Sequence, residues 1–266
     1  MSLLILFAIA PLIVQLIILS VLSGVVNRSA YRLFGKTLYL MLMCPGVIVH
    51  EFSHLLGCLA TGAKVHRVRL FSPREEGGNL ILGEVEHERP KSPVARTVVA
   101  GAPFFGGATA ILLLTRIFFP SAIRTGVAPV VVLQPEVRTL LSALLTAFES
   151  YLHTVRTVFV ALDWSSWRSY ILLYILFSLA AHIAPSRTDL THAAGGATIL
   201  AALLFVTEVV TARISPLYAA TLASSIAKGV GILTVLLGYG LATLCVAAVL
   251  IAILSFSFSI FRGKRR

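Results

Sequence analysis

The sequence predicts an all-α, polytopic membrane protein with about six transmembrane helices. Two observations come from composition: 58% of the 266 residues are hydrophobic and only 12% are charged. A soluble domain carries about 25% charged residues, so a water-soluble globular enzyme and a disordered chain are both excluded. The third observation is that the apolar residues come in stretches of about 20, the length of a helix that crosses a bilayer.

Six stretches are predicted to span the membrane. Only the last is clearly longer than the hydrocarbon thickness, so we expect that helix to tilt or to protrude from the bilayer. The first has neither a basic leader nor a clear cleavage site, and we interpret it as a retained helix. The six ranges are 3–26, 37–60, 94–119, 167–185, 193–212 and 229–260.

Two segments do not fit as spans. Residues 64–90 contain many of the acidic side chains, alternate in polarity and include Gly77 and Gly78, which predicts a small β-hairpin after the second helix. Residues 136–162 have apolar side chains at helical spacing and most charged side chains off that stripe. This pattern predicts one amphipathic helix lying in the membrane interface. If that helix crosses the bilayer instead, the number of spans becomes seven.

The formal net charge of the chain is +11, and the position of its basic residues predicts the orientation of the protein in the membrane. Lys and Arg divide almost evenly between the two sides, but the basic end RGKRR directly follows the last span. The positive-inside rule then places the hairpin and the C-terminus in the cytoplasm. No nucleic-acid partner is expected, because no basic cluster alternates with aromatic residues on a polar domain. We expect a multi-pass protein of a prokaryotic cell membrane, with the lipid bilayer as its surroundings.

The second span contains the strongest functional signal, an HExxH motif formed by His50, Glu51 and His54. Residues four apart on a helix differ by about 40° in direction, so both imidazoles can reach one metal ion. Glu51 can then act as general base on a water held by that metal. An ordinary structural role explains the motif poorly, because ionisable side chains inside a membrane helix are costly.

A metal ion held by two histidines needs a third protein ligand, with water in the remaining position of a Zn²⁺ site. We favour Asp189, because the fourth span brings it to a depth similar to that of His50. The alternative is that Asp189 caps a helix beginning near Leu190. The intramembrane candidates are Asp189, His182, His192 and Glu208.

Three sequence segments resemble motifs of the site-2 protease family of intramembrane zinc metalloproteases: HEFSH, AGAPFF and HIAPSRTDL. The resemblance covers the core spans 37–60, 94–119 and 167–192, with the hairpin 64–90 between the first two. It implies a single membrane-embedded metalloprotease domain over residues 1–266. The implied zinc ligands are His50, His54 and Asp189, with Glu51 as the catalytic base.

The resemblance also has departures and further implications. His182 stands where the family has Asn, and it is interpreted either as a residue that orients substrate or stabilises an oxyanion, or as a hydrogen-bonded core residue. Leu190 replaces a family Gly. The hairpin implies a membrane-anchored protein substrate that adds as a strand near residues 80–86. We interpret His66 and His87 as hairpin surface.

Two other functions compete with proteolysis. An ion or small-solute transporter could use histidine and carboxylate side chains as a relay, but its inverted repeats are not seen in the sequence. A catalytically idle zinc-binding membrane protein, regulatory or chaperone-like, would not need Glu51 for metal binding. Two roles are left open. His192 either supports a metal ligand or is an interfacial polar residue, and Glu208 either gates the site or packs against a neighbouring span.

Overall fold

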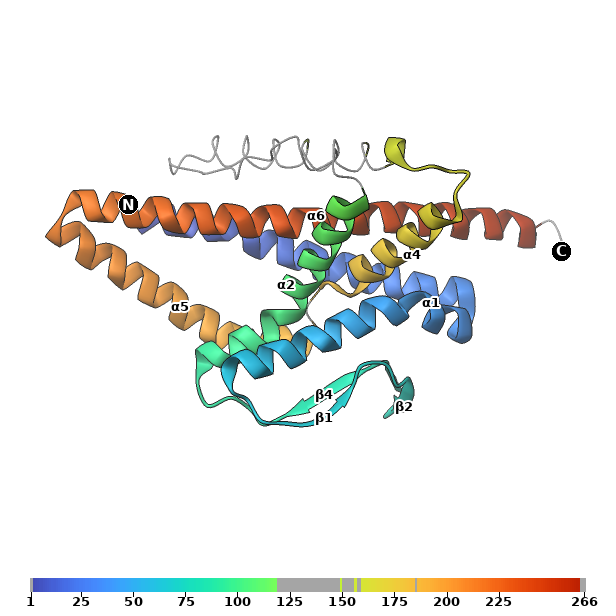
Figure 1. Ribbon diagram of the computed structural model, residues 1–266, viewed down its shortest axis with the longest axis horizontal. Helices are drawn as coiled ribbons and strands as arrows, with labels where there is room; N and C mark the ends of the chain where they lie inside the picture. The colour runs from blue at the N-terminus through green and yellow to red at the C-terminus, as the bar shows by residue number, and fades with distance from the viewer. Residues whose placement is uncertain (1, 119–148, 150–155, 157–158, 185, 264–266) are drawn as a thin grey trace.

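The computed structural model describes residues 2–118, 149, 156, 159–184 and 186–263, and most of them are helical (Figure 1). Its long helices cross one another above a small β-structure at one edge of the molecule (Figure 1). The amphipathic helix predicted at 136–162 lies almost entirely outside the described residues. The helices are α1 (Ser2–Thr61), α2 (Pro93–Phe118), α4 (Trp167–His182), α5 (Arg187–Ile214) and α6 (Pro216–Gly263).

Helix α1 contains both of the first two predicted spans, and a break at Gly35 separates them. Gly35 has φ 72° and ψ 175°, a left-handed backbone value that glycine adopts without steric cost. The chain turns back at this point (Figure 1). The rings of Tyr31 and Tyr39 pack edge to face across the break, with centroids 5.4 Å apart. We refer to residues 2–34 as the first arm of α1 and to residues 36–61 as the second arm.

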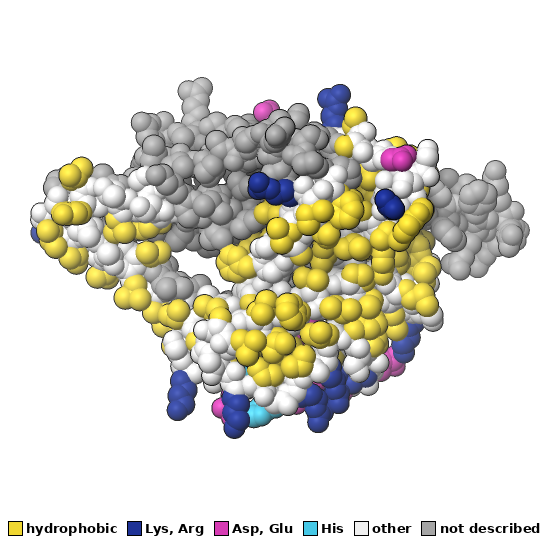
Figure 2. Space-filling view, viewed as in Figure 1, with side chains coloured by type: hydrophobic (Ala, Val, Ile, Leu, Met, Phe, Trp, Pro, Cys, Tyr) yellow, Lys and Arg dark blue, Asp and Glu magenta, His cyan; other side chains and the backbone are white. Residues whose placement is uncertain are grey.

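Three helical stretches of the described chain are long and apolar enough to cross a membrane: Val14–Thr61, Pro93–Phe118 and Gly240–Ser257. Large apolar side chains remain exposed on them, for example Val21 at 62% and Ile253 at 56%. Figure 2 shows hydrophobic side chains over a broad band of the surface and charged ones along the hairpin edge. These features indicate a membrane protein. Because α4 has only 16 residues, the number of six spans stays a prediction.

The predicted hairpin is present as two antiparallel ladders, in which β1 pairs with β4 and β2 pairs with β3. The strands are β1 (Val65–Arg69), β2 (Arg74–Glu76), β3 (Asn79–Ile81) and β4 (Glu84–His87). Gly77 and Gly78 form the turn, with φ of 57° and 78°, as a two-residue type I′ hairpin turn requires. In β1 the burial of successive residues does not alternate strictly, and the register with β4 shifts between Val65 and Arg67.

Proline and glycine open the second arm of α1 one turn before the HExxH motif, and α4 fills the opening. Pro45 has no N–H to bond the carbonyl of Met41, and the Tyr174 hydroxyl donates to that oxygen instead. The Gly46 N–H donates to Ser178 Oγ over 2.8 Å. The Pro45–Gly46 pair therefore joins α1 to α4.

Small residues bring α2 close to the same arm. A Cβ added at Gly57 would lie 2.9 Å from the Cβ of Ala102, and one at Gly106 would collide with Ser53 Oγ. Small residues at helix contacts allow this close approach inside membranes. The AGAPFF segment thus places the backbone of α2 directly beside the HExxH motif.

Candidate metal centre

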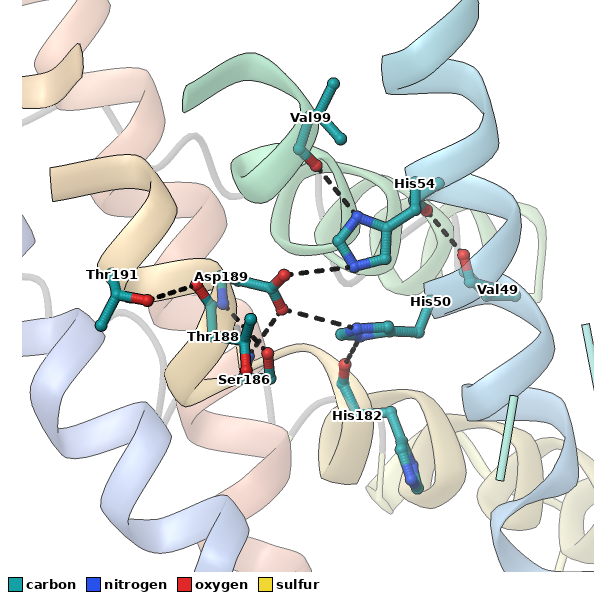
Figure 3. A network of polar contacts seen from close by, with 10 residues as sticks. Val49, His50, His54, Val99, His182, Ser186, Thr188, Asp189 and Thr191 are labelled. Atoms are coloured by element: carbon teal, nitrogen blue, oxygen red, sulfur yellow. Dashed lines mark hydrogen bonds and ion pairs between the residues drawn. The ribbon is translucent and has the colours of Figure 1, made fainter. Parts of the chain in front are cut away.

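The structure brings the three predicted ligands together from two helices. His50 and His54 extend from the second arm of α1 toward Asp189 at the start of α5 (Figure 3). His54 Nε2 lies 3.5 Å from Asp189 Oδ1, and His50 Nε2 lies 4.0 Å from Asp189 Oδ2. One ligand atom from each residue falls within 4.8 Å of the others. All three side chains are largely buried, so this cluster can hold a metal ion.

Backbone carbonyls determine which ring nitrogen of each histidine faces the cluster. His50 Nδ1 lies 2.8 Å from the carbonyl oxygen of His182, and His54 Nδ1 lies 3.0 Å from that of Val99 (Figure 3). A carbonyl oxygen only accepts hydrogen bonds, so each Nδ1 carries the proton. A neutral ring then directs the lone pair of Nε2 at the carboxylate. Two such lone pairs and a carboxylate favour a cation between them.

Asp189 has a structural role as well as a place in the cluster. Ser186 is the N-cap of α5, and its N–H donates to Asp189 Oδ2 over 2.8 Å. The Asp189 N–H donates to Ser186 Oγ over 3.1 Å, completing a capping box. The alternative of Asp189 as N-cap of a helix near Leu190 is therefore wrong, since α5 begins at Arg187. The capping bond orients the carboxylate toward the histidines.

Glu51 and His182 lie beside the cluster and line a cavity of about 860 Å³. Glu51 is next to the hairpin, because a Cβ added at Gly83 would lie 2.7 Å from Glu51 Cγ. The His182 ring points away from the three ligands in Figure 3, and its Nδ1–H donates to the Ser178 carbonyl over 3.2 Å. His182 therefore contacts His50 through its backbone, and any catalytic role of its ring stays a prediction.

The cluster lies between two cavities. The larger, of about 860 Å³, is lined by His50 and Glu51, and the smaller, of about 370 Å³, is lined by His54 and Asp189. The hairpin contributes to both: residues 81–83 line the larger cavity and residues 85–87 line the smaller one. One short segment of the hairpin thus runs past both sides of the cluster.

Sequence reasoning missed two groups of residues around the cluster. Ser23 and Asn27, on the first arm of α1, donate to the Ala181 carbonyl over 2.6 and 2.9 Å and line the larger cavity. Their signal was polarity within the first predicted span, for Ser23, and directly after it, for Asn27. Arg89 and Arg96 line the smaller cavity together with the two hairpin histidines. For Arg96 the signal was a cation in the first turn of a helix, where the helix dipole disfavours it.

No protein-family model, curated protein or solved structure matches the chain. The resemblance to site-2 proteases therefore stays a prediction carried by the quoted motifs. The side chains of His192 and Glu208 fall outside what the structure describes, and their roles stay open.

Proposed function

We propose that the protein is a zinc-dependent intramembrane metalloendopeptidase that hydrolyses peptide bonds of membrane-anchored protein substrates. The observation that carries the proposal is the convergence of His50, His54 and Asp189, with Glu51 next to the first of them. Ionisable side chains inside apolar membrane helices carry a free-energy cost, and they are therefore usually functional. Because no known protein matches the chain, the chemistry of these four residues is the main support for the proposal.

Zinc fits the donor set best. Two imidazole nitrogens and one carboxylate are common zinc ligands, and catalytic sites keep the fourth position open. Bonds of about 2.0–2.1 Å in a tetrahedron place neighbouring donor atoms about 3.3 Å apart. The observed separations between histidine and Asp189 atoms, 3.5 and 4.0 Å, lie somewhat above that value, and one ligand atom from each residue lies within 4.8 Å of the others. The carbonyl bonds to both Nδ1 atoms leave Nε2 free for the metal.

Bound zinc would supply Lewis-acid polarisation of the peptide carbonyl and lower the pKa of water. Glu51 would act as general base toward the attacking water and would donate the proton to the leaving amine. Its position supports this role, because Glu51 lines the larger cavity together with His50. The capping bond from Ser186 and the carbonyl of His182 keep Asp189 and His50 in place during the reaction.

The substrate is a membrane-anchored polypeptide that unwinds locally, because a helix keeps its carbonyls in i to i−4 hydrogen bonds. An extended strand can satisfy its backbone groups by pairing with the hairpin near residues 80–86. The position of residues 81–83 and 85–87 on the two cavities supports this, since a strand beside them passes the cluster. We further propose six spans in a prokaryotic cell membrane, with the hairpin and C-terminus cytoplasmic.

One pair of variants tests the proposal. The purified protein in lipid nanodiscs should contain one zinc per chain by mass spectrometry, and His54→Ala should lose it. Glu51→Gln should keep zinc and lose cleavage of a membrane-anchored reporter. Glu76→Gln, at an exposed glutamate that lines neither cavity, is the matched control and should keep both.

Two outcomes would contradict the proposal in different ways. Zinc that survives His54→Ala would mean that the cluster is not the metal site. Full cleavage by Glu51→Gln would mean that the general base is another group. A zinc-loaded protein that cleaves no membrane-anchored reporter would instead favour the idle metal-binding function.

A further inference from the structure

The smaller cavity has an unusual set of charges for a space inside a membrane protein. Its volume of about 370 Å³ falls within the range of ligand sites, about 300–1,000 Å³. Two of its lining residues, His54 and Asp189, belong to the metal cluster. Four basic side chains also line it: His66, His87, Arg89 and Arg96.

The carboxylates of the described chain do not neutralise the two arginines. Glu86 is the only glutamate that lines the cavity. Its Oε1 lies 3.7 Å from Nη1 of Arg67, a residue that does not line the cavity. The two histidines are engaged at Glu88, one with its carboxylate and one with its carbonyl. Among the residues that the structure describes, neither Arg89 nor Arg96 has an ion-pair partner. A partly buried guanidinium without a counter-charge is costly.

Lipid headgroups explain one of these arginines better than the other. Arg89 is exposed on the loop after β4, where it can reach headgroup phosphates. Arg96 is only partly exposed and lines the cavity together with Val99 and Ala100, one turn further along α2. It also lies in the first turn of that helix, where a cation is disfavoured and no acidic residue compensates. Its position therefore favours a role inside the cavity.

We propose that the smaller cavity is a specificity subsite that binds an acidic side chain of the substrate, on one side of the cleaved bond. Arg96 binds the carboxylate, since a guanidinium offers paired N–H donors that match it. The subsite deepens the proposed proteolysis and rests on it. It defines the substrate class as membrane-anchored proteins with Asp or Glu close to the bond that is cleaved.

The larger cavity does not share this charge. Its lining includes one cation, Arg28, and one carboxylate, Glu51, and most of its other residues are small, hydroxyl-bearing or aliphatic. A strand that follows the hairpin past the cluster would place one flank in each cavity. The preference for an acidic residue is therefore expected on one flank only.

The test measures cleavage of matched membrane-anchored substrates by the full-length protein in nanodiscs. Each position that flanks the cleaved bond carries Glu, Gln or Lys in turn. Glu should raise kcat/KM about fivefold to tenfold over Gln at one or two positions on a single flank, the gain expected of a partly desolvated ion pair. Arg96→Gln should remove this preference, and Arg96→Glu should shift it toward Lys.

Two controls separate charge selection from damage to the fold. Lys91 is an exposed cation between β4 and α2 that does not line the cavity. The preference for Glu should persist in Lys91→Gln. Arg96→Lys keeps the charge and should keep part of the preference. Each variant is also measured for zinc content and thermal unfolding, so that loss of the metal site is detected separately.

A binding measurement keeps the subsite distinguishable from proteolysis. The Glu51→Gln variant should bind the Glu substrate more tightly than the Gln substrate, and Arg96→Gln should abolish the difference. If this holds but no substrate is cleaved by the wild-type protein, the subsite stands and the protease proposal fails. Equal cleavage of Glu and Gln substrates at every position overturns the subsite alone. Competition by anionic lipid vesicles, with none by acidic peptides, also overturns it in favour of a headgroup site.

Discussion

Carbonyl oxygens orient the two histidines of the cluster, and one of these carbonyls comes from the end of a helix. The last carbonyls of α4 have no donor within their own helix. His182 offers its carbonyl to His50, and Ala181 accepts from Ser23 and Asn27 over 2.6 and 2.9 Å. The ending of α4 is therefore held by both arms of α1. His50, a candidate metal ligand, is one of the groups that hold it.

The two roles of Asp189 can be separated by substitution. Asp189→Asn removes the charge but keeps an oxygen that accepts from the Ser186 N–H, so zinc should be lost with little loss of stability. Ser186→Ala should do the reverse, with zinc retained and the free energy of unfolding lowered by about 1 kcal/mol. Zinc content and thermal unfolding of the two variants check the prediction. Equal loss of zinc in both variants would mean that the cap, and not the carboxylate charge, makes the site.

At the scale of elements, the contact between α1 and α4 determines where the His182 carbonyl lies. A Cβ added at Gly46 would overlap the Ser178 carbonyl, which belongs to the backbone and cannot rotate away. Gly46→Ala should displace α4, destabilise the protein by about 1–3 kcal/mol and weaken zinc binding. Thermal unfolding and competition with a zinc chelator measure the two effects.

The matched control for this substitution is Gly195→Ala in α5. An added Cβ there meets no atom within 4 Å, and alanine is the better helix former by up to about 1 kcal/mol. Stability should stay the same or rise, and zinc affinity should not change. If Gly46→Ala behaves in the same way, the close approach of α4 does not hold the site.

The far end of the hairpin is tied to the break in α1 by an ion pair between Lys36 and Glu75. Lys36 donates a hydrogen bond and adds positive charge, and both hold the pKa of the Glu75 carboxyl below its usual value. A lowered pKa in the folded state means that the contact is complete above the usual glutamate range. It is lost as pH falls through the lowered value.

Limited proteolysis of the hairpin should therefore accelerate at acidic pH. In Glu75→Gln the hairpin should be cut at neutral pH as fast as the wild-type hairpin is cut at acidic pH. The acceleration at acidic pH should then be absent from this variant. Glu88→Gln, at the other end of the hairpin, should keep it. A hairpin tip that is cut equally fast at all pH values in the wild-type protein would show that the ion pair does not hold it.

At the scale of the whole molecule, the cluster joins helices that are far apart in the chain. Its candidate ligands come from α1 and α5, the carbonyls that orient them come from α2 and α4, and hairpin residues line both cavities. A metal that binds only the folded arrangement should stabilise all of it. At a free zinc concentration 1,000 times Kd, the expected gain is about 4 kcal/mol.

Calorimetry with and without a zinc chelator measures this gain. The wild-type protein should unfold at a lower temperature after chelation and recover when zinc is added back. His54→Ala should already unfold at the lower temperature and show no response to zinc. A wild-type protein with the same Tm in both conditions would contradict a zinc site that links these helices.

The sequence by itself determined the features that depend on short-range periodicity and composition. Apolar stretches indicate the membrane, the i, i+4 spacing puts His50 and His54 on one helix face, and the Gly77–Gly78 pair makes the hairpin turn. Asp189 could be chosen because ionisable residues are scarce in these spans. Each of these inferences rests either on a few neighbouring residues or on the free-energy cost of placing a charged group in lipid.

Only the tertiary structure decided how those residues are held and what surrounds them. The His182 carbonyl contacts His50 across 132 positions of sequence, and Ser23 contacts Ala181 across 158. Arg96 enters the smaller cavity because α2 packs on α1 through glycines, and Asp189 is oriented by the cap of α5. Local periodicity says which way a side chain points on its own helix. Packing between distant helices determines what that side chain meets.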